Sequence, residues 1–301
     1  MTMLNASPSF SITVPTPIQE TLIVIRREIL TRTTNKTILL ATAALALLLG
    51  TGAAAGGWFL VDAVGDGLSI NLGGKLYFAT AMVTALLISL VYSAASLTSG
   101  VVEEKASRVV EILITKIGVV PLLAGKLIGI GLVTLSQLIL IGGAGVLGFS
   151  LVDGWSVIEA DIGSSLLWFF VWFLLGYIIF AILNTTLAST VSKQEDLSSA
   201  VMPMSFMQMV MLVVSLYVLP KNPDSTILEV LSFFPLSSSY LMPIRYGLGL
   251  VETWELVVAA AIAAVAIPAL FAVATRVYKN NALRTGSKVS LQQSFVASTS
   301  N

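Results

Sequence analysis

The stretch "SSLLWFFVWFLLGYIIFAILNTTL", residues 164–187, contains no charged side chain. An α-helix rises about 1.5 Å per residue, so a run of this length crosses a hydrocarbon layer about 30 Å thick. With the residues that follow, it predicts a membrane-spanning helix over 164–191. Five further apolar stretches predict five more such helices, at roughly 38–61, 76–100, 122–151, 198–219 and 256–277. The expected fold is therefore all-α and integral to a membrane, with six transmembrane helices.

The composition of the whole chain agrees with this class and excludes several chemistries. Hydrophobic residues make up 56% of the 301 residues and charged residues 11%, about half the charged share of a soluble domain. The chain contains neither cysteine nor histidine. It therefore lacks the residues of thiolate catalysis, disulfides and iron–sulfur sites, together with the commonest general base and zinc ligand. We expect no catalytic residue, no metal site and no cofactor bound by this chain.

Basic residues are divided unequally between the two sides of the membrane that six spans define. Of the sixteen lysines and arginines, all but three fall on the side of the two termini, and the three are Lys75, Lys221 and Arg245. Cytoplasmic segments carry the basic excess, so both termini are expected in the cytoplasm. The expected location is the plasma membrane of a prokaryote, as a multi-pass protein.

The predicted domain division is a cytoplasmic arm over 1–36, a six-span membrane domain over 37–278 and a cytoplasmic tail over 279–301. In the arm, residues 20–36 have helical periodicity and predict an interfacial helix. Its expected apolar face is formed by Leu22, Ile25, Ile29 and Leu30, and the cations expected to meet lipid phosphates are Arg26, Arg27, Arg32 and Lys36. The alternative is a plain charged flank that stops the first span from sliding.

The segment "FFPLSSSYLMPIRYGLG", residues 233–249, follows the fifth predicted span and mixes aromatic, proline and small polar residues. This composition predicts a broken helix pair at the outer face. Whether the wider region 221–250 dips back into the membrane stays open, because non-helical backbone at membrane depth requires protein or water to satisfy it.

The predicted spans are nearly free of ionisable residues. Asp62 and Lys75 lie at span margins, and Lys126 is close enough to the cytoplasmic edge to extend its amine toward water. Carriers driven by protons or ions need charged groups inside the bundle, so any energy for transport is expected to come from outside the membrane. Candidate residues of a translocation path are Gln137, Asn184, Met204, Met207, Gln208 and Met211. Hydrogen bonding between helices and ordinary packing are the alternatives for these side chains.

Two pairs of glycines in the spans have the spacing that lets helices approach closely. Gly52 and Gly56 form one pair, and Gly125 and Gly129 form the other. Small residues four positions apart are typical of close helix contacts in membranes, although the pattern is weak in a glycine-rich membrane protein.

A charged cluster interrupts the apolar sequence in "VVEEKASRVVEILITK", residues 101–116. Glu103, Glu104 and Arg108 match the first EExxxR signature of the CAAX-type intramembrane proteases, but those enzymes also need histidines, which this chain lacks. At 100° per residue, Val102, Ala106, Val109, Val110 and Leu113 form one face, and Glu103, Glu104, Ser107, Arg108 and Glu111 form the other. The segment 101–118 therefore predicts an amphipathic cytoplasmic helix whose charged face meets water or a partner.

The sequence "EEKASRVVEILITKIGVVPLLAGKLIG", residues 103–129, resembles a characteristic segment of type-two ABC exporter permeases, particularly the sodium- and drug-efflux subgroup. The resemblance continues at 26–36, at 233–245 and at 276–295. It implies that 101–118 is the coupling helix that docks on a separate ATPase subunit. The implied contact residues are Glu103, Glu104, Lys105, Arg108 and Glu111. The subgroup's large external domain after the first span is missing, because only about thirteen residues, 62–74, are available here.

The chain also lacks the phosphate-binding pattern G-x-x-x-x-G-K-[ST]. ATP and Mg²⁺ are therefore expected at a partner ATPase. The predicted function is a permease subunit that exports a substrate by alternating access, paired with a second copy or a paralogue and in contact with membrane lipid but not with nucleic acid. The alternatives are a membrane scaffold or assembly factor without transport, and an intramembrane enzyme, against which the missing histidine and cysteine argue.

Overall fold

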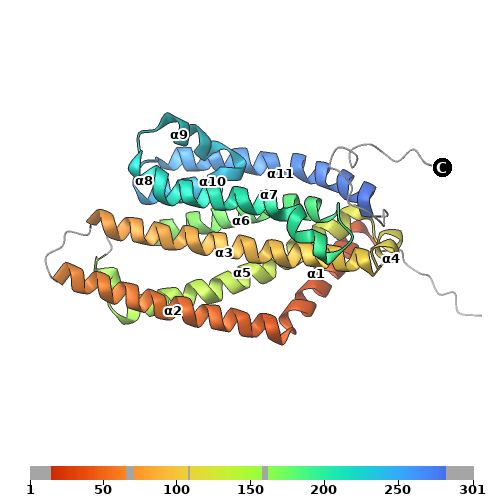
Figure 1. The fold of residues 1–301 in the computed structure, drawn as a ribbon, viewed down its shortest axis with the longest axis horizontal. Coiled ribbons are helices and arrows are strands. Elements are labelled where there is room, and N and C mark those ends of the chain that lie inside the picture. The colour runs from red at the N-terminus through yellow and green to blue at the C-terminus, as the bar shows by residue number, and fades with distance from the viewer. Residues whose placement is uncertain (1–14, 66–70, 108, 158–161, 283–301) are drawn as a thin grey trace, which may run out of the picture.

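Residues 15–65, 71–107, 109–157 and 162–282 are described in a computed structural model, and within these ranges the chain is helical with no strand. Six long helices lie side by side (Figure 1). They are α2 (Lys36–Gly65), α3 (Asn71–Ala106), α5 (Val119–Leu151), α6 (Ile162–Ala188), α7 (Gln194–Val213) and α11 (Thr253–Ala282). A π-helical turn, Val214–Val218, and the short α8 (Leu219–Lys221) continue α7. The six predicted spans and the all-α membrane fold are confirmed.

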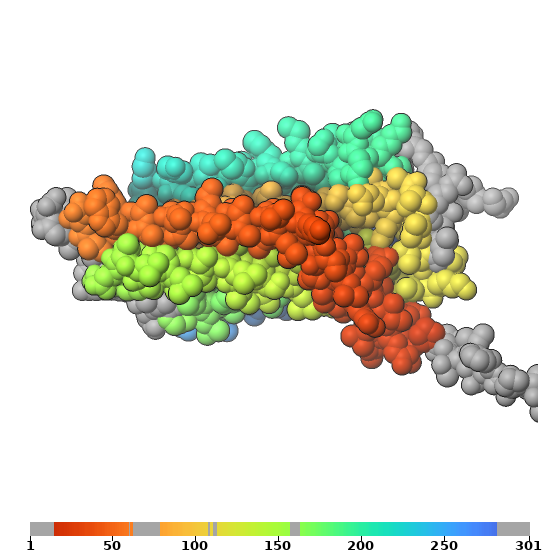
Figure 2. Space-filling model, turned by 90° about the horizontal axis from the view of Figure 1, so that it is seen from below, coloured from red at the N-terminus to blue at the C-terminus, as the bar shows by residue number. Residues whose placement is uncertain are grey.

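The interior of the bundle is built around α6, which packs against α3, α10 (Pro235–Gly247) and α11. Trp172, Phe173 and Phe180 of α6 are at most 1% exposed. By contrast, α2 lies on the outside beside α5, as Figure 2 shows, and Leu47 and Leu48 are among its many exposed apolar side chains. In a bilayer an exposed apolar face meets lipid, so such a helix needs no cover from the protein.

One end of the bundle carries both ends of the described chain. The helix α1 (Pro17–Thr33) begins with a capping box in which the side chains of Thr16 and Gln19 each bond the other's backbone N–H. It turns out of the line of α2 at the end where α4 (Val109–Lys116) lies (Figures 1 and 2). The last residues of α11 lie at this same end. An even number of spans requires this arrangement.

The opposite end carries the 3₁₀ turn Gly154–Val157 that follows α5, and a broken helix pair, α9 (Thr226–Phe233) and α10. The axes of α9 and α10 differ by 120° across the break at Phe234. Since α8 and the start of α11 lie at one end (Figure 1), the pair enters and leaves the bundle there. The broken helix pair is confirmed, and the Ser237 hydroxyl supports the break by donating to the Leu231 carbonyl at 2.5 Å.

Candidate functional site: the charged end of the bundle

Glu104 joins three helices at the end of the bundle that carries α1 and α4. Its Oε1 lies 2.5 Å from Nη2 of Arg27 on α1, and its Oε2 lies 2.7 Å from Nζ of Lys126 on α5. The Lys126 side chain is 2% exposed and that of Glu104 15%. Removing one partner of such a pair leaves a buried charge uncompensated, which costs more than breaking a pair on the surface.

The ionic network extends along α1 from Arg27. Nη2 of Arg27 also lies 2.6 Å from Glu28, whose second carboxylate oxygen lies 3.7 Å from Nε of Arg32. Arg32 donates in turn to the Ser96 carbonyl of α3 at 2.9 Å. We call the five charged side chains the α1 network: Arg27, Glu28, Arg32, Glu104 and Lys126. It contains three cations and two carboxylates.

The pKa of Arg27 reflects this setting. Burial alone lowers it, but hydrogen bonds and the negative charges of Glu28 and Glu104 outweigh that effect, so the pKa is raised above its usual value. The guanidinium therefore stays protonated at any pH at which a membrane protein is handled.

Two glycines let α1 lie directly on α5. A Cβ added at Gly125 would come within 2.6 Å of Val24 Cβ, and one at Gly129 within 2.9 Å of Glu28 Cβ. Larger residues at either position would push α1 off α5 and pull the α1 network apart. The predicted close contact at this glycine pair is confirmed, whereas Gly52 of the other pair has no atom within 4 Å of its added Cβ.

The region 101–118 does not form the single amphipathic helix that its pattern predicts. Residues 101–106 are the last turns of α3, which ends at Ala106, and α4 begins at Val109. In the expected apolar face, Val102 and Val110 are buried but Ala106 and Val109 are exposed. The prediction is wrong because the residues before and after the break fit one helical pattern. The pattern alone therefore does not show that one helix ends at Ala106 and another begins at Val109.

The predicted charged face is also divided. Glu103 is exposed, as expected. Glu104 instead pairs with Arg27 and Lys126, and Lys105 is 3% exposed and donates to the Ser189 carbonyl at 2.9 Å. The expectation that Glu104 lies on a face turned toward water or a partner is therefore wrong, whereas the implied contact of Lys105 with an ATPase stays a prediction. Arg108 and the side chain of Glu111 lie outside the described residues.

Three of the basic residues near the membrane surface are held in ion pairs. Arg27 and Arg32 are held in the α1 network rather than left for lipid phosphates, whereas Arg26 and Lys36 are exposed. Lys126 does not extend toward water but is buried against Glu104. The expected apolar face of α1 is split as well: Leu22 and Leu30 are exposed and Ile25 and Ile29 are half-buried.

The six candidate path residues lie in different contacts. Gln137 donates to Thr42 of α2 at 2.9 Å, Asn184 donates to the Phe180 carbonyl of its own helix at 2.8 Å, and Gln208 donates to the Tyr240 hydroxyl at 3.2 Å. The remaining three, Met204, Met207 and Met211, are half-buried against the core. Met204, Met207, Gln208 and Met211 share one face of α7 by their spacing, and the role of all six residues in transport stays a prediction.

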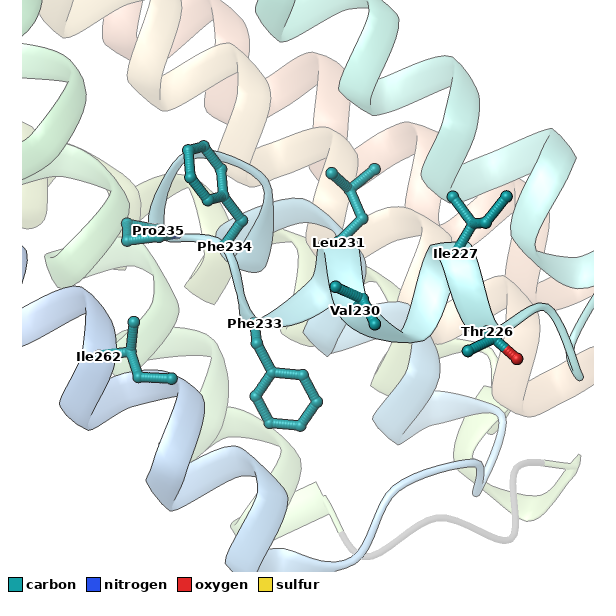
Figure 3. Close-up of a pocket in the computed structure, with 8 residues that line it drawn as sticks. All are labelled: Thr226, Ile227, Val230, Leu231, Phe233, Phe234, Pro235 and Ile262. Carbon is teal, nitrogen blue, oxygen red and sulfur yellow. The ribbon is translucent and has the colours of Figure 1, made fainter.

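An apolar groove lies on the outside of the broken helix pair. It encloses about 590 Å³ between α9, the start of α10 and Ile262 of α11 (Figure 3). Its lining is apolar apart from Thr226. Among the described residues no group of three acidic, histidine or cysteine side chains could hold a metal ion.

Sequence reasoning missed the α1 network and a buried arginine, Arg245, on α10. Arg245 is 5% exposed and donates to the Ser232 hydroxyl at 2.7 Å. A signal was present for the network, since Lys126 stands inside an apolar stretch where a lysine requires a partner. The identity of that partner could not be read from residues more than twenty positions away.

Comparison with known proteins gives the family. Residues 69–276 match the profile described as ABC-2 family transporter protein. The uncharacterized protein YhaP of Bacillus subtilis is 30% identical over 225 residues, covering 72% of this chain and 54% of that protein. The uncharacterized protein MJ1024 of Methanocaldococcus jannaschii is 28% identical over 200 residues, covering 64% of this chain and 47% of that protein.

The chain thus spans about half the length of the curated relatives that it matches. The matched profile covers more than half of this chain, from before the described start of α3 to the last turns of α11. This coverage and the six spans make the chain a multi-pass membrane protein. The chain belongs to the ABC-2 family of membrane transporter proteins.

Proposed function

We propose that this chain is the permease subunit of an ATP-binding-cassette exporter and moves its substrate outward by alternating access. A separate ATPase subunit hydrolyses ATP with Mg²⁺, because this chain has no phosphate-binding loop of its own. Family membership and the resemblance at 103–129 support the assignment.

One observation carries the mechanical part of the proposal: α1 contacts the chain on both sides of α4. Before α4, Arg27 binds Glu104 at the end of α3. After α4, Glu20 accepts a hydrogen bond from the Gly118 N–H at 3.4 Å, and Val24 packs on Gly125. A displacement of α4 would therefore be passed to α1, α3 and α5 together.

The proposed contact with the ATPase is α4 and the exposed residues that flank it. Glu103 at the end of α3 and Lys116 at the end of α4 are exposed. Arg108 and Glu111 belong to the same proposed contact by their place in the chain. We assign Glu104 and Lys105 a different task, which is to anchor the end of α3 to α1, α5 and the loop after α6.

The proposed arrangement places both termini in the cytoplasm, as the excess of basic residues supports. A second copy or a paralogue would complete the transporter, and the apolar α2 on the outside of the bundle offers a surface for it. Relatives in a bacterium and an archaeon support a prokaryotic plasma membrane. Membership of the sodium- and drug-efflux subgroup stays a proposal that names no substrate.

The test is association with an ATPase encoded beside this chain. The variant combines Glu103→Lys with Lys116→Glu, which reverses two exposed charges, and Glu252→Lys at the opposite end is the matched control. Like charges opposed across an interface cost several kcal/mol. We expect the double variant to lose co-purification and ATP hydrolysis at equal membrane abundance while the control keeps both. Undiminished association in the double variant would contradict the proposal, and a scaffold would show no hydrolysis in either case.

A further inference from the structure

Arg245 is a buried cation without a carboxylate partner among the described residues. It lies on α10, in the broken helix pair, and is 5% exposed. Nη1 donates to the Ser232 hydroxyl at 2.7 Å, and Nε has no hydrogen-bond partner. A guanidinium carries five N–H donors and cannot be neutralised by deprotonation in a protein.

The buried lysine at the other end of the bundle, unlike Arg245, has a carboxylate partner among the described residues. There the buried Lys126 is paired with Glu104 at 2.7 Å. A buried charge is costly unless it is paired, and an ionisable residue at membrane depth is retained for function more often than by accident. Arg245 has a hydroxyl where Lys126 has a carboxylate, so a full negative charge is missing beside it.

The serines that follow the break on α10 offer Arg245 no negative charge. Ser237 and Ser238 already donate to the backbone carbonyls of Leu231 and Pro235. The Ser239 hydroxyl and the Trp172 indole N–H are buried and have no partner.

Two of the side chains without a partner, Ser239 and Trp172, lie on the elements that pack together as α6 and α10. A Cβ added at Gly176 would come within 2.7 Å of the Ser239 hydroxyl oxygen, and Trp172 stands one turn away on the same face of α6. The indole N–H and the Arg245 Nε–H can only donate. Among the described residues, the Arg245 Nε–H and the Trp172 N–H are therefore buried donors with no acceptor bonded to them.

We propose that Arg245 is the recognition point for an anionic group, a phosphate or a carboxylate, that reaches the junction of α9 and α10 beside Ser232. The planar guanidinium matches the two oxygens of such a group in a bidentate pair. Transport of the bound anion rests on the proposed function, whereas binding of the anion does not.

The test uses the purified full-length chain in detergent and needs no ATPase, so it can fail independently of the proposed function. The unfolding temperature is measured with oleate and with oleyl alcohol, which share a chain and differ in the carboxylate. Inorganic phosphate alone tests a soluble anion, and nanodiscs of phosphatidylglycerol against phosphatidylcholine test a lipid headgroup. The variants are Arg245→Gln and Arg245→Lys, and Arg276→Gln, an exposed arginine at the other end, is the control.

We expect at least one anionic probe to stabilise the unaltered chain above its neutral counterpart, and the responding arm identifies the source of the anion. Arg245→Gln should weaken that binding about tenfold or more, because a charge-assisted hydrogen bond is lost, while Arg276→Gln should not. If Arg245→Gln does not fold, Arg245→Lys decides, since it keeps the charge but loses the fork and should bind several-fold more weakly. Equal response to charged and neutral probes, or equal binding by Arg245→Lys and the unaltered chain, would overturn the proposal and leave Arg245 as a clamp for Ser232.

Discussion

Glu104 at the end of α3 and Lys126 near the start of α5 form an ion pair of 2.7 Å in which the lysine side chain is 2% exposed. The pair links the chain before the short helix α4 to the chain after it, because α4 lies between these two residues in the sequence. Because Arg27 shares the same carboxylate, α1 is held to both. The part of the chain that we propose to receive force from an ATPase is thus fastened to three helices at once.

Removing the shared carboxylate is expected to destabilise the protein strongly. Glu104→Gln leaves Lys126 buried without a counter-charge, and breaking a buried pair in this way costs roughly 3–5 kcal/mol. The neighbouring Glu103→Gln removes an exposed charge and should change stability by less than about 0.5 kcal/mol. Unfolding of the purified proteins in denaturing detergent measures both, and similar values for the two variants would show that the network carries no stability.

Removing the lysine instead should be milder. Lys126→Met replaces the buried amine with an apolar side chain of similar length, and Glu104 keeps Arg27 as its partner. Breaking a buried pair is costly when it leaves a charge without a counter-charge, and Lys126→Met leaves none, because Arg27 still pairs with Glu104. We expect the loss in the same unfolding measurement to be well below that of Glu104→Gln. A Lys126→Met variant less stable than Glu104→Gln would contradict this order.

The contact of α1 with α5 should be sensitive to a single methyl group. Gly125→Ala puts a Cβ about 2.6 Å from Val24 Cβ, which forces α1 to shift, and overpacking typically costs about 1–3 kcal/mol. Gly143→Ala on the same helix meets no atom within 4 Å and should be neutral or slightly stabilising because alanine favours helix. A cysteine at Val24, in a chain with no native cysteine, reports the shift by faster thiol labelling in the Gly125→Ala background. Equal labelling in both glycine variants would argue against the close contact.

The orientation in the membrane can also be tested by thiol labelling, because the chain has no native cysteine. Ser107 and Ser156 are both exposed and follow α3 and α5, which end at opposite ends of the bundle. If the termini are cytoplasmic, a membrane-impermeant thiol reagent on intact cells should label a cysteine at Ser156 and not one at Ser107. Permeabilised cells, in which both should react, are the control. The reverse pattern in intact cells would invert the topology.

Much of the fold follows from the amino-acid sequence by itself. Six apolar stretches such as 164–191 specify six spanning helices, because every backbone polar group in a bilayer must be satisfied within its own helix. The prolines and serines of 233–249 likewise indicate the broken pair of α9 and α10. The motif at 103–129 points to the family that the matched profile shows.

The tertiary structure decided what each charged side chain meets. A helical pattern placed Glu104 on a polar face, but a polar face can be covered by water or by Arg27 and Lys126 alike, and only packing distinguishes the two. The surroundings of Arg245 depend on packing in the same way. Its burial beside Ser232 arises from the 120° bend between α9 and α10. Hydrophobic length is a local property of the sequence and determined the spans, whereas the partner of a charge depends on which distant helices the fold brings within about 4 Å of it.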